Sequence, residues 1–154
     1  MTTGEFAPWC GGSIISTKHV LTAAHCTKDK FAPSIEILIG EHDVGDTEAD
    51  RRAISSIIDH PYFDYTDKNL DISILTLALT LTFTSAVAPI CLPSSIGYAN
   101  YDYTYSEYSN HEATVTGWGL NATGGQAANT LQEVDLTILA NSECEEAWGS
   151  QIKR

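Results

Sequence analysis

The sequence of 154 residues contains no run of about 18 apolar residues, the length that a membrane-spanning helix needs. It is also poor in basic residues, with eight lysines and arginines against twenty aspartates and glutamates and a formal net charge of −12 at pH 7. A chain with this charge repels phosphate backbones and anionic lipid surfaces. The sequence therefore excludes a helical membrane span and argues against nucleic acid or a membrane as a partner.

The first residues, Met1 to Glu5, lack the basic and apolar segments of a signal peptide, which on its own favours a cytosolic chain. The four cysteines point the other way. Cys10, Cys26, Cys91 and Cys144 form no Cys-x-x-Cys pair of the kind found in zinc sites, and they are spread as in a secreted disulfide framework. Two interpretations stay open: a cytosolic chain with free thiols, or a secreted protein whose N-terminus has been lost.

The apolar residues, which with Tyr and Cys make up 43% of the chain, fall largely in short runs rich in Val, Ile and Leu. Glycine, proline, aspartate and asparagine separate these runs, a rhythm typical of an antiparallel β-sandwich or barrel and not of alternating βαβ units. The expected strands are Ser13–Ile15, His19–Leu21, Ile35–Ile39, Ala53–Ile58, Ile72–Leu79, Ala113–Thr116 and Leu131–Leu139.

Only two short helical pieces are expected. Thr22 is placed to cap a single turn that carries His25. Ser142 and Glu145 have the spacing of a capping box and predict a helix through Trp148. The acidic run 41–50 and the polar, tyrosine-rich stretch 98–112 are expected to be loops.

Two segments carry most of the functional information: Leu21-Thr22-Ala23-Ala24-His25-Cys26 and Asn69-Leu70-Asp71-Ile72. Together with eight further segments, they resemble a trypsin-like serine protease domain of the chymotrypsin fold (S1 family). The further matching segments are Gly4–Phe6, Cys10–Ile15, Gly40–Asp43, Asp59–Tyr62, Ser73–Leu75, Pro89–Pro93, Thr114–Gly119 and Leu131–Val134.

The resemblance implies roles for four residues. His25 matches the general base that takes the serine proton and later donates it to the leaving amine, and Asp71 matches the carboxylate that orients this ring. Cys10 and Cys26 match a disulfide that ties the histidine turn to the preceding strand. Without this context His25 would be an ordinary packed or surface histidine and Asp71 a turn residue. The remaining histidines match no catalytic position and are expected on the surface or in loops: His19, His42, His60 and His111.

The chain also departs from the family pattern. The family nucleophile lies in a Gly-Asp-Ser-Gly-Gly segment, and no serine of this sequence has that context, so the chain is expected to be truncated before the nucleophile. Pro8-Trp9 runs directly into Cys10, where the family has a further strand, and this leaves an open barrel edge. The family partners of Cys91 and Cys144 are missing, so these thiols are expected to be free.

The implied fold is all-β, a chymotrypsin-like double six-stranded antiparallel β-barrel of which the chain holds a part. Residues 1–154 are expected to form a partial peptidase domain. Residues 1–92 would be the first barrel, short of one strand; residues 93–112 a tyrosine-rich connecting loop; and residues 113–154 the start of the second barrel.

Two weaker signals concern ligands and modification. The acidic run 41–50 occupies the calcium-loop position of the family, and Glu41 is a candidate ligand, since carboxylates suit calcium. Arg51 lies near the place of a late acidic ligand, which favours a solvated loop, so no cofactor is expected. Asn121-Ala122-Thr123 is a glycosylation sequon, usable only in a secreted protein.

The leading hypothesis is therefore a piece of a secreted serine endopeptidase that acts on protein or peptide substrates and meets protease inhibitors, and that is inactive as this chain alone. The alternative is a non-catalytic homologue that acts as a binding module. A metalloprotein that uses His25 and the cysteines is disfavoured, because no ligand pair has the short spacing of zinc sites.

Overall fold

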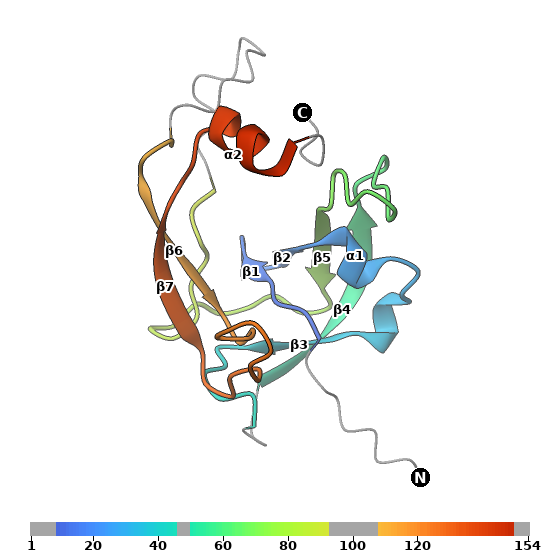
Figure 1. Ribbon diagram of the computed structural model, residues 1–154. Helices are drawn as coiled ribbons and strands as arrows, with labels where there is room; N and C mark the ends of the chain where they lie inside the picture. Colours follow the sequence, from blue (N-terminus) through green and yellow to red (C-terminus); the bar gives the residue numbers. More distant parts are fainter. Residues whose placement is uncertain (1–8, 46–49, 93–107, 150–154) are drawn as a thin grey trace. The chain divides into compact units, whose positions relative to one another are not determined.

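The computed structural model describes residues 9–45, 50–92 and 108–149. The chain forms two compact units, Met1–Leu92 and Pro93–Arg154, which we describe separately (Figure 1). The tyrosine-rich loop predicted for residues 93–112 lies mostly outside the described residues. In the part of the chain that the structure describes, no helix has both the length and the apolar character needed to cross a membrane.

The first unit is built on one antiparallel sheet that curls on itself (Figure 1). Its strands are β1 (Ser13–Ile14), β2 (His19–Thr22), β3 (Glu36–Ile39), β4 (Asp50–Asp59) and β5 (Ser73–Leu77). They are ordered β1-β2-β5-β4-β3, so that β5 is central and pairs with β2 on one side and β4 on the other. The described residues of this unit form five strands, and the predicted all-β, antiparallel class is confirmed.

Alternation along β5 builds the core of this unit. Ser73, Leu75 and Leu77 are buried, while the residues between them are partly exposed. The predicted strand was too long at its end, because the chain leaves the sheet after Leu77 and the Leu81 backbone N–H donates to the Thr17 carbonyl. As a result the Leu81 side chain is buried, whereas the Leu79 side chain is exposed. The buried apolar cluster consists of Val20, Ile35, Ile39, Ile54, Leu75, Leu77 and Leu81.

A single helical turn, α1 (Ala24–Thr27), follows β2 directly. The expectation that Thr22 caps this turn was wrong, because Thr22 is the last residue of β2 and pairs with Ser73. The Thr22 hydroxyl instead donates to the Gly11 carbonyl at 2.8 Å. A 3₁₀ turn at Ala32–Ser34, which the sequence analysis did not predict, precedes β3.

The second unit holds the antiparallel pair β6 (Glu112–Gly117) and β7 (Gln132–Thr137), followed by α2 (Asn141–Trp148). Val115 faces Val134 across the pair, and Thr114 faces Asp135 and donates to it at 2.6 Å. Opposite residues share a face of the pair, so one face of this hairpin is apolar and the other polar.

The predicted C-terminal helix is present, but its start was placed two residues too late. Ala140 is the N-cap of α2, and its backbone N–H donates to the Glu143 carboxylate at 2.8 Å. Glu143, not Glu145, therefore has the position at the third residue of the helix from which a carboxylate reaches back to the cap.

Candidate active site

The sheet brings together two residues that lie 46 positions apart in the chain. Thr22, at the end of β2, pairs with Ser73, at the start of β5. Because the two strands are antiparallel, the segment that follows Thr22 and the segment that precedes Ser73 meet at one edge of the sheet. His25 lies on the first segment and Asp71 on the second.

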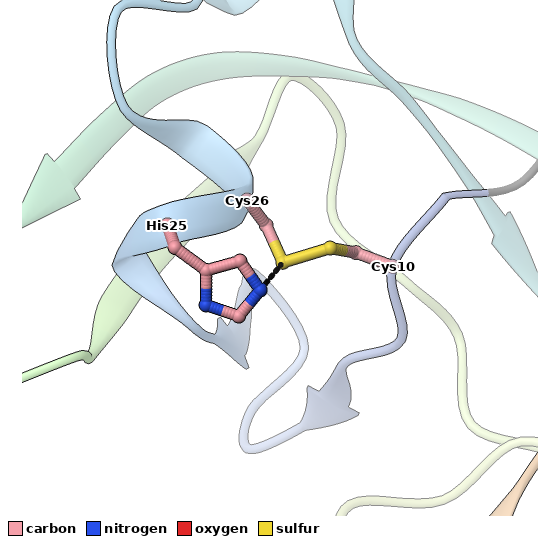
Figure 2. Close-up of side chains that lie close together, drawn as sticks. All are labelled: Cys10, His25 and Cys26. Carbon is pink, nitrogen blue, oxygen red and sulfur yellow. Dashed lines mark hydrogen bonds between the residues drawn. A yellow bond between two sulfur atoms is a disulfide. The ribbon is translucent and has the colours of Figure 1, made fainter. Parts of the chain in front are cut away.

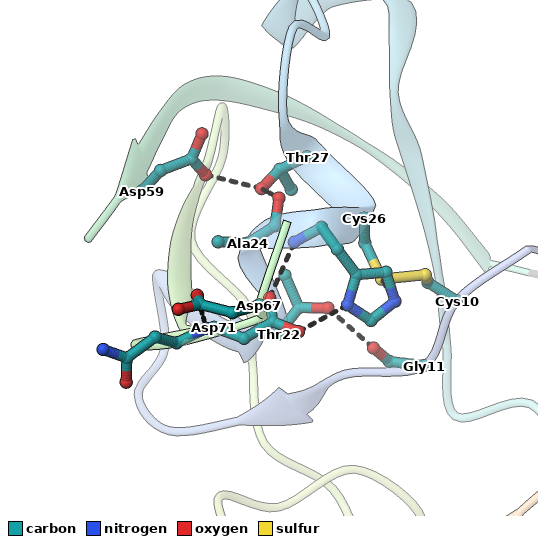
Figure 3. Close-up of polar contacts among 11 residues, drawn as sticks. Cys10, Gly11, Thr22, Ala24, Cys26, Thr27, Asp59, Asp67 and Asp71 are labelled. Carbon is teal, nitrogen blue, oxygen red and sulfur yellow. Dashed lines mark hydrogen bonds and ion pairs between the residues drawn. A yellow bond between two sulfur atoms is a disulfide. The ribbon is translucent and has the colours of Figure 1, made fainter. Parts of the chain in front are cut away.

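His25 and Asp71 are joined by two hydrogen bonds (Figure 3). The ring Nδ1 lies 2.6 Å from Asp71 Oδ2, and the backbone N–H of His25 donates to Oδ1 at 2.7 Å. An ionised carboxylate only accepts hydrogen bonds, so Nδ1 carries the ring proton and the lone pair of a neutral ring lies on Nε2. The His25 side chain is 44% exposed and that of Asp71 21%, so the His25 ring is partly open to solvent.

The turn that carries Asp71 has an unusual backbone. Lys68 and Leu70 both adopt positive φ, at 55° and 56°. The Ile72 N–H donates to the Leu70 carbonyl at 2.8 Å, which closes a tight turn centred on Asp71. A left-handed conformation is costly for a bulky residue such as Leu70, and such conformations cluster at functional sites. Here it aims the Asp71 carboxylate at α1.

Opposing effects set the pKa of Asp71. Burial raises the pKa of this carboxyl, whereas the hydrogen bonds from the His25 side chain and backbone lower it, as does electrostatic attraction to His25 and Lys68. The net result is a pKa below the ordinary carboxyl value. Asp71 is therefore a fixed negative charge at neutral pH, as the carboxylate partner of a general base must be.

The turn that carries His25 is held from several sides. The Cys10–Cys26 disulfide is present, as the resemblance implied, and the Trp9 indole N–H donates to the Cys26 carbonyl at 3.4 Å. The buried Thr27 hydroxyl donates to Asp59 Oδ1 at 2.5 Å (Figure 3). Sequence reasoning missed the Trp9 and Thr27 contacts, because no local pattern links Thr27 to a carboxylate 32 residues away.

The other ring nitrogen of His25 faces sulfur (Figure 2). Nε2 lies 3.5 Å from Sγ of Cys26, the sulfur that is bonded to Cys10. The ring proton is on Nδ1 and a disulfide sulfur carries no hydrogen, so this approach is a van der Waals contact. Within the described residues the ring therefore hydrogen-bonds to Asp71, and no serine takes part. In the described part of the chain the imidazole and the carboxylate are thus paired with no serine beside them.

The remaining predicted residues lie apart from this pair. Cys91 and Cys144 are free thiols, and Asn121 is exposed. The Glu41 carboxylate accepts the N–H groups of His42 and Asp43, which occupies it within its own turn. Residues 46–49 of the acidic run lie outside the described part of the chain. Among the described residues, Glu41 belongs to no cluster of His, Cys, Asp and Glu close enough to hold a metal ion.

Comparison with known proteins gives the family that this chain resembles. The family model described as Trypsin matches residues 1–154. The chain is 33% identical to a venom serine protease of Polistes dominula over 151 residues, and 36% identical to Trypsin-1 of Astacus astacus over 151 residues. These matches cover 94% and 92% of this chain but 51% and 58% of the two relatives, so the chain spans about half of their length. The matches to the family model and to these relatives establish that the chain belongs to the trypsin family of serine proteases.

Proposed function

We propose that this chain supplies the general base and its carboxylate partner to a serine endopeptidase that cleaves protein or peptide substrates through an acyl-enzyme. The observation that carries the proposal is the 2.6 Å contact between His25 Nδ1 and Asp71 Oδ2. With the proton held at Nδ1, the Nε2 lone pair can accept the proton of an attacking serine and later return it to the leaving amine. The Asp71 charge stabilises the imidazolium that forms between these steps.

We further infer that the 154-residue chain alone does not hydrolyse peptides. None of its serines lies in a Gly-Asp-Ser-Gly-Gly segment, the family context of the nucleophile. The same segment supplies the backbone N–H groups of the oxyanion hole, whose loss alone costs roughly 3–4 kcal/mol of transition-state stabilisation per donor. Without a nucleophile no acyl-enzyme can form, and without an oxyanion hole its transition state is not stabilised.

A secreted parent protein is supported by the disulfide. A structural disulfide such as Cys10–Cys26 persists in oxidising compartments, such as the secretory pathway or the cell exterior, and is rare in the cytosol. Asn121 is exposed and would be available there for glycosylation. The formal charge of −12 disfavours nucleic acid and anionic membranes as partners, which leaves protein substrates and protein inhibitors of the protease as the expected ones.

The proposal is tested with a fluorophosphonate probe, which reacts covalently with an activated serine. The purified 154-residue chain should remain unlabelled. The product of the complete coding sequence should be labelled at a serine beyond residue 154, and labelling should fall by roughly 10³-fold or more in His25→Ala and strongly in Asp71→Asn. His60→Ala serves as the matched control and should label normally, because the His60 ring accepts the Tyr62 N–H and lies against the Tyr62 ring.

Two outcomes would overturn the proposal. Labelling of a serine within residues 1–154 that depends on His25 would contradict the inactivity of the chain. A complete product that carries another residue, such as glycine, at the nucleophile position and binds partners without labelling would support the binding-module alternative instead.

A further inference from the structure

Three consecutive residues of α1 are each held by a different segment of the chain. His25 is hydrogen-bonded to Asp71, in the turn before β5, and the disulfide joins Cys26 to the segment before β1. Thr27 is hydrogen-bonded to Asp59, the last residue of β4 (Figure 3). Asp59 is therefore a second carboxylate that holds this turn, and it has no part in the chemistry proposed above.

We propose that Asp59 is a positioning residue for His25: its bond to the Thr27 hydroxyl fixes the rotation of α1 and so keeps the imidazole on its carboxylate partner. The consequence for catalysis rests on the proposed function. The consequence for the orientation of the ring does not.

α1 has little means of holding its own place. It is a single turn of four residues, and its N-cap residue, Ala23, makes no side-chain hydrogen bond to it. Helices this short are unstable in isolation, because their few internal hydrogen bonds do not offset the loss of chain entropy. Contacts with other segments therefore decide where α1 lies and how it is rotated about its axis.

The spacing of the held residues explains why the bond at Thr27 matters. Successive residues of an α-helix are about 100° apart around the axis, so the side chains of His25 and Thr27 leave the turn on nearly opposite sides, roughly 160° apart. A turn held at His25 and Cys26 alone can still roll toward the side of these two residues. The bond at Thr27 acts on the far side and opposes that rotation.

The fold also makes Asp59 a firm support. Asp59 pairs with Ser73 on β5, and Ser73 pairs on its other side with Thr22 on β2. Thr22 lies two residues before α1, and Ser73 lies two residues after Asp71. One row of paired residues thus connects the acceptor of the Thr27 bond to both segments of the candidate site. Groups placed on strands in this way are held more precisely than groups on loops.

The bond between Thr27 and Asp59 is of a strong kind. Thr27 is buried, and its hydroxyl oxygen lies 2.5 Å from Asp59 Oδ1 and 3.2 Å from the Ala24 carbonyl oxygen. The single hydroxyl proton goes to the nearer acceptor, which is also the charged one. Bonds from a hydroxyl to a carboxylate are about 2.5–2.7 Å long and roughly twice as strong as those between neutral groups.

The experiment observes the His25 ring by nuclear magnetic resonance in the 154-residue chain with ¹⁵N-labelled histidine, and His25→Ala assigns the signals. At about pH 9 an imidazole is neutral, so the ¹⁵N shifts give the share of each tautomer. The low-field signal of the Nδ1 proton reports its bond to Asp71. We expect the parent to hold the Nδ1–H tautomer. Thr27→Val and Asp59→Ala should each lose the low-field signal and gain the Nε2–H tautomer.

Control variants separate loss of positioning from loss of stability. Thr27→Ser retains the hydroxyl and should restore the spectrum of the parent. Thr114→Val removes a similar bond, from Thr114 to Asp135 at 2.6 Å between β6 and β7, and should leave the His25 signals unchanged. Ile54→Val weakens the core of the first unit and should leave them unchanged as well. Parent signals in Thr27→Val, or an equal loss of signal in Ile54→Val, would overturn the proposal.

Folding is followed by far-ultraviolet circular dichroism in the same samples. If Thr27→Val does not fold, Asp59→Asn is examined in its place, because the amide keeps the shape and one acceptor oxygen but loses the charge. The Nδ1 proton signal of His25 should then be broadened by exchange with water. A signal as sharp as that of the parent would count against the proposal.

The consequence for catalysis is measured on the product of the complete coding sequence. Thr27→Val should slow labelling by the fluorophosphonate probe by about tenfold to a hundredfold, and Thr27→Ser should restore it, since small displacements of a catalytic group have effects of this size. Unchanged labelling in Thr27→Val would show that Asp59 does not position the base. A parent product that is not labelled would contradict the proposed function, whereas the His25 spectrum would still decide the orientation of the ring.

Discussion

Asp71 holds His25 with both of its carboxylate oxygens, one 2.6 Å from the ring Nδ1 and the other accepting the backbone N–H at 2.7 Å. The bond to the backbone N–H fixes the main chain of α1, and the bond to Nδ1 fixes the ring. Asp71 therefore sets both the position and the tautomer of His25. The same pair therefore links the stability of the unit to its proposed chemistry.

This pair makes stability depend on pH in the acid range. The folded-state pKa of Asp71 lies below its ordinary value of 3.8, so its stabilisation is fully present above that value and is lost as the pH falls through the lowered pKa. We expect the free energy of unfolding of the parent to exceed that of Asp71→Asn at pH 7, and the difference to shrink below about pH 4. Urea unfolding at a series of pH values measures this difference.

Asp29→Asn is the control for the loss of one negative charge, because the Asp29 side chain is exposed. A pH dependence in Asp71→Asn equal to that of the parent would show that the carboxylate contributes nothing to acid stability.

The hydroxyl of Thr27 is predicted to matter more than its methyl group. Thr27 is buried and donates to Asp59 at 2.5 Å, so Thr27→Val keeps the shape but removes a donor from a carboxylate. We expect a loss of about 1–3 kcal/mol in the free energy of unfolding, measured by urea denaturation. Thr27→Ser retains the hydroxyl and should lose only about 0.8 kcal/mol for the missing methyl group. A valine variant as stable as the serine variant would contradict this assignment.

Ser73 presents the opposite case. Its side chain is 1% exposed, and its hydroxyl has no hydrogen-bond partner among the described residues. Burying an unpaired hydroxyl is unfavourable, so Ser73→Ala should leave the midpoint of urea unfolding unchanged or raise it. Ser55→Ala is the comparison, since the Ser55 hydroxyl donates to the Thr76 carbonyl at 3.2 Å. A loss above about 1 kcal/mol in Ser73→Ala would indicate a partner for this hydroxyl.

Leu77, the last residue of β5, and Leu79, which follows the strand, provide a matched test of the core. Leu77 is 0% exposed and Leu79 is 70% exposed. Leu77→Ala should cost about 2–5 kcal/mol, which is enough to unfold a unit of marginal stability, because it leaves a cavity between the packed strands. Leu79→Ala should change the free energy of unfolding by less than about 0.5 kcal/mol. Similar losses in the two variants would mean that the sheet does not end at Leu77.

Local sequence was sufficient for the strands. Alternation and turn residues predicted each of the seven strands found in the described residues, because a strand that buries one face has side chains with a period of two. Strand ends and helix caps were less accurate. Whether Thr22 caps α1 or extends β2 depends on its pairing with Ser73, and this partner lies far away in the chain.

The sequence by itself determined the family, the antiparallel β class and the Cys10–Cys26 pairing, and it singled out His25 and Asp71 as candidate site residues, because short segments of fixed composition carry them. The tertiary structure alone decided how these residues meet. The pairing of β2 with β5 sets the two bonds between His25 and Asp71, and the disulfide brings the Cys10 sulfur close to His25. Both relationships join segments far apart in the chain, and only the folding of the sheet fixes such distances.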